Sequence, residues 1–154
     1  MADTLVKMIL RDEDATVNLA QKIAPMLAKG DTILLEGPIG AGKSAFARAL
    51  IRARLGRMED VPSPTFTLVQ TYEDDDSDIW HCDLYRLTHP DEAFELGLEE
   101  AFETAICLIE WPDRLGQDAP SDAMTMTFSA HEDHHEVIGA GPVTWKEKLR
   151  GLHD

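Results

Sequence analysis

Short apolar stretches recur along the chain and predict its strands. Some are nearly continuous apolar runs, which are typical of buried strands, and others alternate between apolar and polar positions, as half-buried strands do. The predicted strands span residues 5–10, 31–35, 66–72, 79–83, 105–110 and 123–129.

Helical patterns lie between these strands. The first begins at the acidic segment 11–14 and runs to about Lys29, with Gly30 as its end and a kink or break expected at Pro25. The second covers residues 45–55 and ends at Gly56. Two further helices are predicted over residues 90–104, with an interruption near Gly97, and over residues 143–152.

The alternation of strands and helices predicts a single α/β domain over residues 1–154. Parallel strands need helical crossovers, so the sheet is expected to be mostly parallel, with helices on both faces in three layers. An acidic turn at residues 73–78 separates two predicted strands, which indicates a β-hairpin inserted into this sheet. The sequence contains no internal repeat and no low-complexity linker.

A glycine-rich segment between the strand 31–35 and the helix 45–55 is the strongest chemical signal. Residues 37–44 fit the phosphate-loop pattern G-x-x-x-x-G-K-[ST] at every fixed position. Its glycines let backbone N–H groups approach a polyphosphate, and the following helix adds a partial positive charge. Lys43 can reach the β- and γ-phosphates, and the Ser44 hydroxyl can ligate Mg²⁺. An ordinary glycine-rich turn is the alternative, but the strand and helix on either side favour a nucleotide site. The residues expected to contact the nucleotide are Gly37, Pro38, Ile39, Gly40, Ala41, Gly42, Lys43 and Ser44.

Two acidic residues end predicted strands. Glu110 closes the strand 105–110, and an acidic group in that place holds or positions Mg²⁺ beside a phosphate loop; the alternative is a surface glutamate after a core strand. Asp83 closes the strand 79–83 and leaves two interpretations open. It is either a second carboxylate near Mg²⁺ or the attacking water, or a helix cap for the segment that begins at Leu84.

Other candidates carry weaker signals. Thr65, in a proline-containing loop, fits a hydroxyl that senses Mg²⁺ or the γ-phosphate, but an ordinary turn threonine is favoured. Trp111 either covers the nucleotide, contacts a partner or packs locally. The segment 131–135 invites a metal-site interpretation, yet a flexible hairpin turn is favoured because no further ligand set accompanies it. For the basic cluster of Arg48, Arg52, Arg54 and Arg57, a solvated helix face is favoured over a docking surface.

Charge and composition narrow the classes of partner. The net charge of −15, from 14 basic and 29 acidic residues, disfavours direct binding of nucleic acid and suits a basic protein partner. The chain has no apolar run of 18 residues and no basic signal-peptide start, so no membrane contact and a cytosolic location are expected. Cys82 and Cys107 lie in apolar runs and are expected to be reduced core thiols.

Four segments together resemble one family. They are GPIGAGKS at residues 37–44, SPTFTLV at 63–69, DLYRL at 83–87 and CLIEWP at 107–112. In order and spacing they are similar to the bacterial TsaE family, also called YjeE, an ATPase subunit required for threonylcarbamoyladenosine biosynthesis in tRNA. The resemblance spans about residues 12 to 112. One departure lies in the late hairpin, where the family commonly has a Gly-Arg pair and this chain has residues His134-His135-Glu136.

The resemblance implies a small P-loop ATPase that works with the TsaB and TsaD proteins. TsaD transfers the threonylcarbamoyl group to adenosine 37 of tRNAs that read ANN codons, so tRNA would be bound through the partners. Ser44 and Glu110 would then hold Mg²⁺, while Lys43 would contact the ATP phosphates. Thr65 would lie in a switch-like loop, and Asp83 would be an active-site carboxylate.

Three alternatives differ in class. A small-molecule P-loop kinase should have an arginine-rich lid, but the segment after Glu110 offers only Arg114 nearby. A GTP-dependent switch should have an N-K-x-D-type motif, which the sequence lacks. A regulatory module that binds ATP without turnover has the same motifs as the ATPase, and only measurement separates the two.

Overall fold

A single mixed β-sheet with helices on both faces forms the protein. The computed structural model describes residues 3–56, 60–62, 64, 68–74 and 77–152. Within these residues the strands are β1 (Asp3–Leu10), β2 (Thr32–Glu36), β3 (Val69–Glu73), β4 (Asp78–Asp83), β5 (Ala105–Glu110), β6 (Met124–Ala130) and β7 (His135–Gly141). The α-helices are α1 (Glu13–Ile23), α2 (Lys43–Leu55), α3 (Asp91–Glu95), α4 (Leu98–Thr104) and α5 (Thr144–Lys148), and two 3₁₀ segments are η1 (Ala24–Met26) and η2 (Pro112–Asp118).

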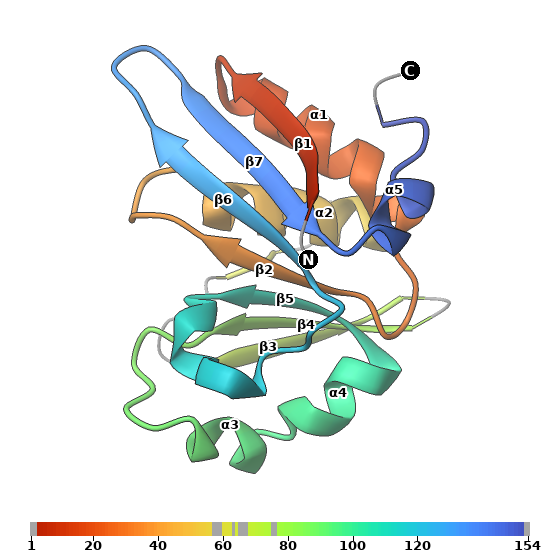
Figure 1. Cartoon of the computed structure of the whole chain (residues 1–154), viewed down its shortest axis with the longest axis vertical. Coiled ribbons are helices and arrows are strands. Elements are labelled where there is room, and N and C mark those ends of the chain that lie inside the picture. Colours follow the sequence, from red (N-terminus) through yellow and green to blue (C-terminus); the bar gives the residue numbers. More distant parts are fainter. Residues whose placement is uncertain (1–2, 57–59, 63, 65–67, 75–76, 153–154) are drawn as a thin grey trace.

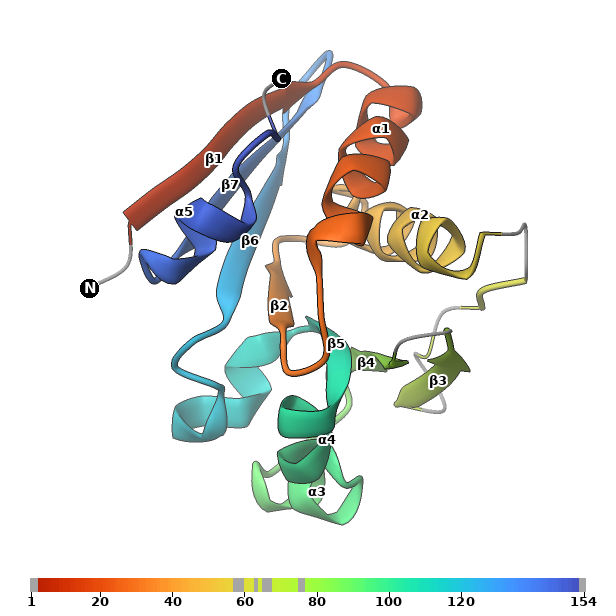
Figure 2. The ribbon, with the colours of Figure 1, turned by 90° about the vertical axis from the view of Figure 1, so that its right-hand side faces the viewer.

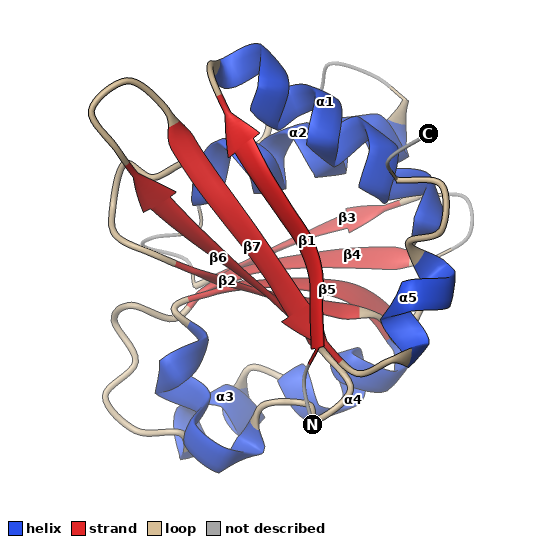
Figure 3. Ribbon diagram, turned by 45° about the horizontal axis from the view of Figure 1, so that its top comes forward, coloured by secondary structure: helices blue, strands red, loops and turns tan. Residues whose placement is uncertain are grey.

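The strand order is β1-β7-β6-β2-β5-β4-β3 (Figures 1 and 3). The four central strands, β6, β2, β5 and β4, are parallel to one another. Antiparallel pairs add β7 and β1 at one edge and β3 at the other. The expectation of a mostly parallel sheet therefore holds for the centre, but the sheet as a whole is mixed. The predicted hairpin is confirmed as β3–β4.

Helices cover both faces of the sheet, as Figure 2 shows. Helices α1 and α2 pack on one face, and α3 and α4 lie on the other, which confirms the three-layer arrangement. The alternation of side chains along strand β5 supplies both faces. Ile106 and Leu108 join the hydrophobic cluster under α1 and α2, while Cys107 and Ile109 join the cluster on the other face. All of its residues are buried, as expected of a central parallel strand.

Local signals in the sequence locate several element ends correctly. The break expected at Pro25 is confirmed, because proline cannot donate the backbone hydrogen bond that would continue the helix, but α1 stops at Ile23 and only a 3₁₀ turn follows, so the helix does not reach Lys29 as predicted. Gly97, at φ +87°, separates α3 from α4, and Gly56, at φ +70°, ends α2. The predicted strand 66–72 begins at Val69 in the structure, and residues 66 and 67 lie outside the described residues.

The C-terminal third departs most from the sequence prediction. Strand β7 was not predicted, because Gly139 and Gly141 interrupt its apolar pattern. Gly141 is a tight packing position, since a Cβ built on it would lie 3.2 Å from the Ala123 carbonyl oxygen, whereas one on Gly139 would make an ordinary contact at 3.5 Å from Val6. The helix predicted over residues 143–152 is the shorter α5, whose Trp145 joins the cluster under α1 and α2.

Both cysteines are free and buried, as expected of reduced core thiols. Burial raises the pKa of Cys107 to about 12, and burial together with the neighbouring Cys107 and Asp83 raises that of Cys82. The thiols therefore stay protonated at neutral pH and are poor metal ligands. None of the described helices is long and apolar enough to cross a membrane.

Candidate functional site

The segment 37–44 forms a left-handed, glycine-dependent turn between β2 and α2. Gly37, Gly40 and Gly42 all have positive φ, at +136°, +86° and +107°. A Cβ built on Gly37 would lie 2.3 Å from the Phe128 carbonyl oxygen of β6, so only glycine fits there. Helix α2 begins at Lys43, two residues before the predicted start, and thus directs its N-terminus into the turn. Of the other predicted contact residues, Pro38 and Ile39 are accessible, with Ile39 83 % exposed, whereas Ala41 is buried.

Lys43 holds a buried amine. Among the described residues its Nζ has no hydrogen-bond partner, although the residue is only 5 % exposed. The Nζ lies 3.8 Å from the centroid of the Trp111 ring, a cation–π distance. Burial lowers the pKa of Lys43, and the negative charges of Glu110, Asp83 and Asp113 oppose that shift. Such an orphaned cation is suited to an anionic ligand that supplies the missing acceptors.

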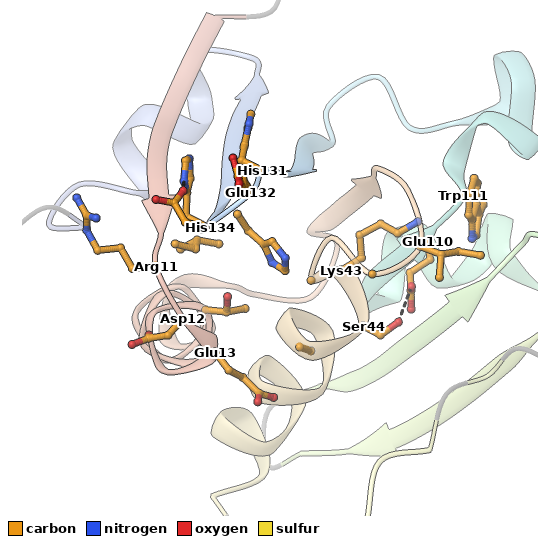
Figure 4. Close-up of a pocket in the computed structure, with 18 of the residues that line it drawn as sticks. Arg11, Asp12, Glu13, Lys43, Ser44, Glu110, Trp111, His131, Glu132 and His134 are labelled. Atoms are coloured by element: carbon orange, nitrogen blue, oxygen red, sulfur yellow. Dashed lines mark hydrogen bonds and ion pairs between the residues drawn. The ribbon is translucent and has the colours of Figure 1, made fainter.

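Glu110 and Ser44 are brought together as the sequence predicted (Figure 4). The Ser44 hydroxyl donates to Glu110 Oε1 at 3.0 Å, across 66 positions of sequence. The parallel pairing of β2 with β5 places Glu110 opposite Leu35, just before the phosphate loop. A hydroxyl and a carboxylate in contact beside a phosphate loop form an oxygen donor set of the kind that Mg²⁺ prefers.

His81 is a residue of the candidate site that sequence reasoning missed. Its Nε2 donates to Glu110 Oε2 at 2.7 Å, and both side chains are buried. Burial by itself would raise the pKa of Glu110, but the bond and charge of His81, the Ser44 bond and the Lys43 charge together lower it. His81 therefore positions an ionised Glu110 so that Oε1 meets Ser44. The sequence carried one usable signal, a polar residue two positions before Asp83 on the same strand.

Replacing His81 by alanine is expected to lower the free energy of unfolding by about 3 kcal/mol, because it leaves one oxygen of a buried carboxylate without its donor. His81→Gln, which retains an N–H donor, should lose less. Urea unfolding at neutral pH measures both, and His89→Ala, at an exposed histidine beside Asp91, is the matched control. Equal loss in the alanine and glutamine variants would contradict the positioning role.

Asp83 lies next to this group. It is the register partner of Glu110 across the β4–β5 pair, is 6 % exposed and borders the cavity. Its Oδ1 also accepts from the Tyr85 N–H at 3.1 Å, so it caps the turn after β4 as well. The predicted helix cap is wrong in form, because a turn and not a helix follows Asp83 before α3, and the active-site role stays a prediction. Thr65 lies outside the described residues, and its expected role stays a prediction.

An aromatic pair covers one side of the site. The rings of Trp111 and Tyr85 lie 5.0 Å apart, and the Arg114 guanidinium lies 5.7 Å from the Tyr85 ring. Trp111 itself has a positive φ of +59°, a strained conformation for a tryptophan. The side chain therefore packs locally and also contacts Lys43, which places it at the edge of the cavity.

One cavity of about 810 Å³ joins these groups to the N-terminal end of α1 and to the β6–β7 turn. Lys43, Ser44 and Glu110 lie at one end, and Arg11, Asp12, His131 and His134 lie at the other (Figure 4). A volume of this size is within the range of small-molecule and cofactor sites. The long shape suits a ligand with a polyphosphate at one end and an organic group at the other.

The arginine cluster is not a uniform solvated face. Arg54 donates to Asp74 Oδ2 at 2.7 Å and to the carbonyl oxygens of Ala24 and Leu27 at 3.0 Å. It ties α2 to η1 and to the segment after β3, so it is structural. Arg48 reaches the Val61 carbonyl oxygen at 3.3 Å. Arg57 is outside the part of the chain that the structure describes.

Comparisons with known proteins agree on one family. A family profile described as "Threonylcarbamoyl adenosine biosynthesis protein TsaE" matches residues 10–138. A "tRNA threonylcarbamoyladenosine biosynthesis protein TsaE" from Rickettsia bellii is 39 % identical over 125 residues, covering 81 % of this chain and 87 % of that protein. The protein of the same name from Bacillus subtilis is 33 % identical, covering 80 % and 78 %. The crystal structure of Bacillus subtilis YdiB has a TM-score of 0.83 at 26 % identity, covering 99 % of this chain and 96 % of that one.

Proposed function

The chain belongs to the TsaE family of threonylcarbamoyl adenosine biosynthesis proteins, and from this premise we propose that it is the Mg²⁺-dependent ATPase of that pathway. ATP hydrolysis would support the threonylcarbamoylation of adenosine 37 in tRNAs that read ANN codons. The nucleotide would occupy the cavity over the phosphate loop, with ADP as the product.

The single observation that carries the ATP-binding proposal is the buried, unpartnered amine of Lys43 at the N-terminus of α2. A folded protein rarely holds a desolvated cation without acceptors unless a ligand provides them. The glycine turn and the helix N-terminus add backbone donors of the same polarity. Phosphate oxygens match all of these donors.

The residues beside Lys43 fit a magnesium ion. Ser44 and Glu110 would ligate Mg²⁺ through oxygen, with His81 fixing the carboxylate. When bound, the ion neutralises negative charge on the phosphate oxygens. Asp83, 6 % exposed and level with Glu110, is placed to orient a water or a metal-bound ligand. When the nucleotide binds, the Lys43 amine would leave the Trp111 ring and contact the phosphates, and Trp111 would cover that side of the cavity.

The proposed protein partners rest on the net charge of the chain and on the family. A chain with a net charge of −15 is a poor binder of a tRNA backbone by itself. We therefore propose that TsaD and TsaB bind the tRNA and that this chain acts on that complex through ATP. A role in this pathway would put the protein in the cytosol, with the tRNA.

Two alternatives are less well supported. A small-molecule kinase needs basic residues over the transferred phosphate, and on the described walls of the cavity Lys43 and Arg11 are the only lysine or arginine side chains. A regulatory ATP-binding module without turnover needs no ordered carboxylate. Here Glu110 is held by both Ser44 and His81, an arrangement that favours hydrolysis.

Depletion of this protein in its own cell is expected to lower threonylcarbamoyladenosine in total tRNA, because the pathway loses its ATP-driven subunit. Mass spectrometry of digested tRNA measures the nucleoside. Wild type and Lys29→Met, which alters an exposed lysine, should restore it, and Lys43→Met should not. A normal nucleoside content after depletion would refute the role in tRNA modification.

A further inference from the structure

Side chains from both sides of the β6–β7 turn converge on one face of that hairpin. His131 and His134 are the pair that closes the turn, with the His131 N–H donating to the His134 carbonyl oxygen at 2.8 Å. Glu136 follows two positions later, opposite Ser129 in the register. Because side chains alternate between the faces of a strand, these four residues share a face. One donor atom from each of His131, His134 and Glu136 lies within 4.8 Å of the other two.

This face is distinct from the one that meets the phosphate loop. His135 lies between the two groups in sequence and points to the other side, where a Cβ built on Gly42 would lie 3.3 Å from its Nδ1. The turn borders the end of the cavity that is remote from Lys43 and Glu110 (Figure 4). The three converging side chains are therefore separate from Lys43, Ser44 and Glu110, the residues proposed to hold the phosphates and Mg²⁺, although His131 and His134 line the far end of the same cavity.

We propose that His131, His134 and Glu136 form a binding site for one late transition-metal ion of the Zn²⁺ type. Two imidazoles and one carboxylate are a donor set that Zn²⁺ accepts, with a fourth position left for water. Imidazole donors also select against Mg²⁺ and Ca²⁺, which prefer oxygen. The site is thus chemically different from the magnesium site proposed at Ser44.

Hydrogen bonds orient both imidazoles. His134 Nδ1 donates to Asp133 Oδ1 at 2.6 Å, which leaves its Nε2 for an ion, and His131 Nε2 is bonded to Ser129 Oγ at 3.1 Å, which leaves its Nδ1. A carboxylate on the far nitrogen of a ligating histidine is the usual arrangement around protein-bound zinc. The two rings are stacked, with centroids 4.8 Å apart and 15° between their planes, so at least one ring must rotate for both nitrogens to point at one ion.

The remaining adjustment is small. Zinc–nitrogen bonds of about 2.0 Å place ligand atoms about 3.3 Å apart in a tetrahedron, and one donor atom of each residue already lies within 4.8 Å of the other two. His131 is exposed and His134 half-buried, so rotation about their side-chain bonds can achieve this.

Among the described residues, the two cysteines and two other histidines are not placed to bind the same metal ion. Cys82 and Cys107 are buried in β4 and β5, which β2 separates from the β6–β7 hairpin, and their raised pKa values keep them protonated. His81 is bonded to Glu110 and buried. The exposed His89 lies 3.5 Å from Asp91 but has no second imidazole beside it in the part of the chain that the structure describes. It is thus a matched single-histidine control.

Equilibrium dialysis of the untagged full chain against Zn²⁺, without nucleotide, tests the proposal. We expect one ion per chain, and with Co²⁺ the visible absorption bands of a four- or five-coordinate ion. His131→Gln and His134→Gln should each weaken Zn²⁺ binding at least about 10-fold, and Asp133→Asn, acting through His134, about 10-fold. His89→Gln should leave the affinity unchanged.

Three results would overturn the proposal. The first is no binding of Zn²⁺ in large excess over the protein. The second is equal affinity in the wild type and in the double variant His131→Gln/His134→Gln. The third is an equal loss in His89→Gln. Circular dichroism confirms that each variant is folded before dialysis, and the Co²⁺ spectrum of the wild type tests the ligand set without any substitution. The proposal does not depend on ATP hydrolysis, so either can fail alone.

Discussion

Lys43→Met is expected to abolish nucleotide binding. The Lys43 amine is the one lysine or arginine cation at the phosphate-loop end of the described cavity. Its Nζ has no hydrogen-bond partner among the described residues, so the substitution removes contacts with the ligand and breaks no hydrogen bond within the protein. Removing a preorganised charge from a water-poor site lowers the stabilisation of a polyphosphate by roughly 100- to 1,000-fold. Calorimetric titration with ATP and Mg²⁺ measures the affinity, and phosphate release with the expected TsaB and TsaD partners measures turnover.

The same substitution should leave the ligand-free protein at least as stable as the wild type. The folded chain holds the Lys43 ammonium largely desolvated, with burial lowering its pKa, so methionine removes a charge that folding disfavours. The contact with the Trp111 ring is preserved in kind, because a thioether also packs on an aromatic face. Urea unfolding without nucleotide compares the two proteins.

Lys29→Met is the control for Lys43→Met. It makes the same change in net charge at an exposed position and should alter neither affinity nor unfolding. Undiminished ATP binding in Lys43→Met would remove the basis of the proposed function. A large loss of stability in that variant would mean that the amine serves the fold rather than a ligand.

The predictable part of this structure rests on local signals. The phosphate loop, the break at Pro25 and the stop at Gly56 each follow from what one or two residues permit in their own backbone. Glu110 was located correctly because a central parallel strand is buried along its whole length, so a charged residue at its end marks the edge of the sheet. These features need no knowledge of which strands are neighbours.

The parts that the sequence did not predict depend on long-range pairing. Strand β7 is held between β1 and β6, and its Gly141 is explained only by the close approach to the Ala123 carbonyl oxygen. His81 becomes a partner of Glu110 because β4 lies beside β5, although 29 positions separate the two residues. The histidines of the β6–β7 turn gain a third donor, Glu136, only once β7 exists as a strand. Each of these residues is visible in the sequence, but the sequence does not indicate which distant residue or strand it contacts.

Glu110→Gln is the second substitution with a large expected effect. Glutamine keeps the shape of the side chain and one oxygen for Ser44 but removes the negative charge. Because His81, Ser44 and Lys43 lower the pKa of Glu110 below its ordinary value, the carboxylate is ionised at neutral pH. Mg²⁺-dependent ATP hydrolysis is therefore expected to fall at least about 100-fold, as removal of a charge-stabilising group in an active site does.

Binding of the nucleotide should survive in Glu110→Gln, because Lys43 and the loop backbone remain. In Glu110→Gln the affinity for ATP without Mg²⁺ should be near normal, but adding Mg²⁺ should increase that affinity much less than in the wild type. Lys43→Met should lose affinity for ATP both with and without Mg²⁺. Asp83→Asn is the comparison, since Asp83 is level with Glu110 on the neighbouring strand. Wild-type turnover in Glu110→Gln together with inactive Asp83→Asn would transfer the metal role to Asp83, because only one of the two carboxylates would then be required.

The pH dependence of the free energy of unfolding tests whether the folded protein stabilises the ionised form of Glu110. A carboxyl group whose folded pKa is lowered contributes stability above its unfolded pKa, near 4.5, and that contribution is lost as the pH falls through the lower folded value. Wild type should therefore lose more unfolding free energy between neutral pH and pH values below that range than Glu110→Gln does. Parallel pH curves for the two proteins would mean that the carboxylate is as well solvated in the folded chain as in the unfolded one, which its bonds to His81 and Ser44 contradict.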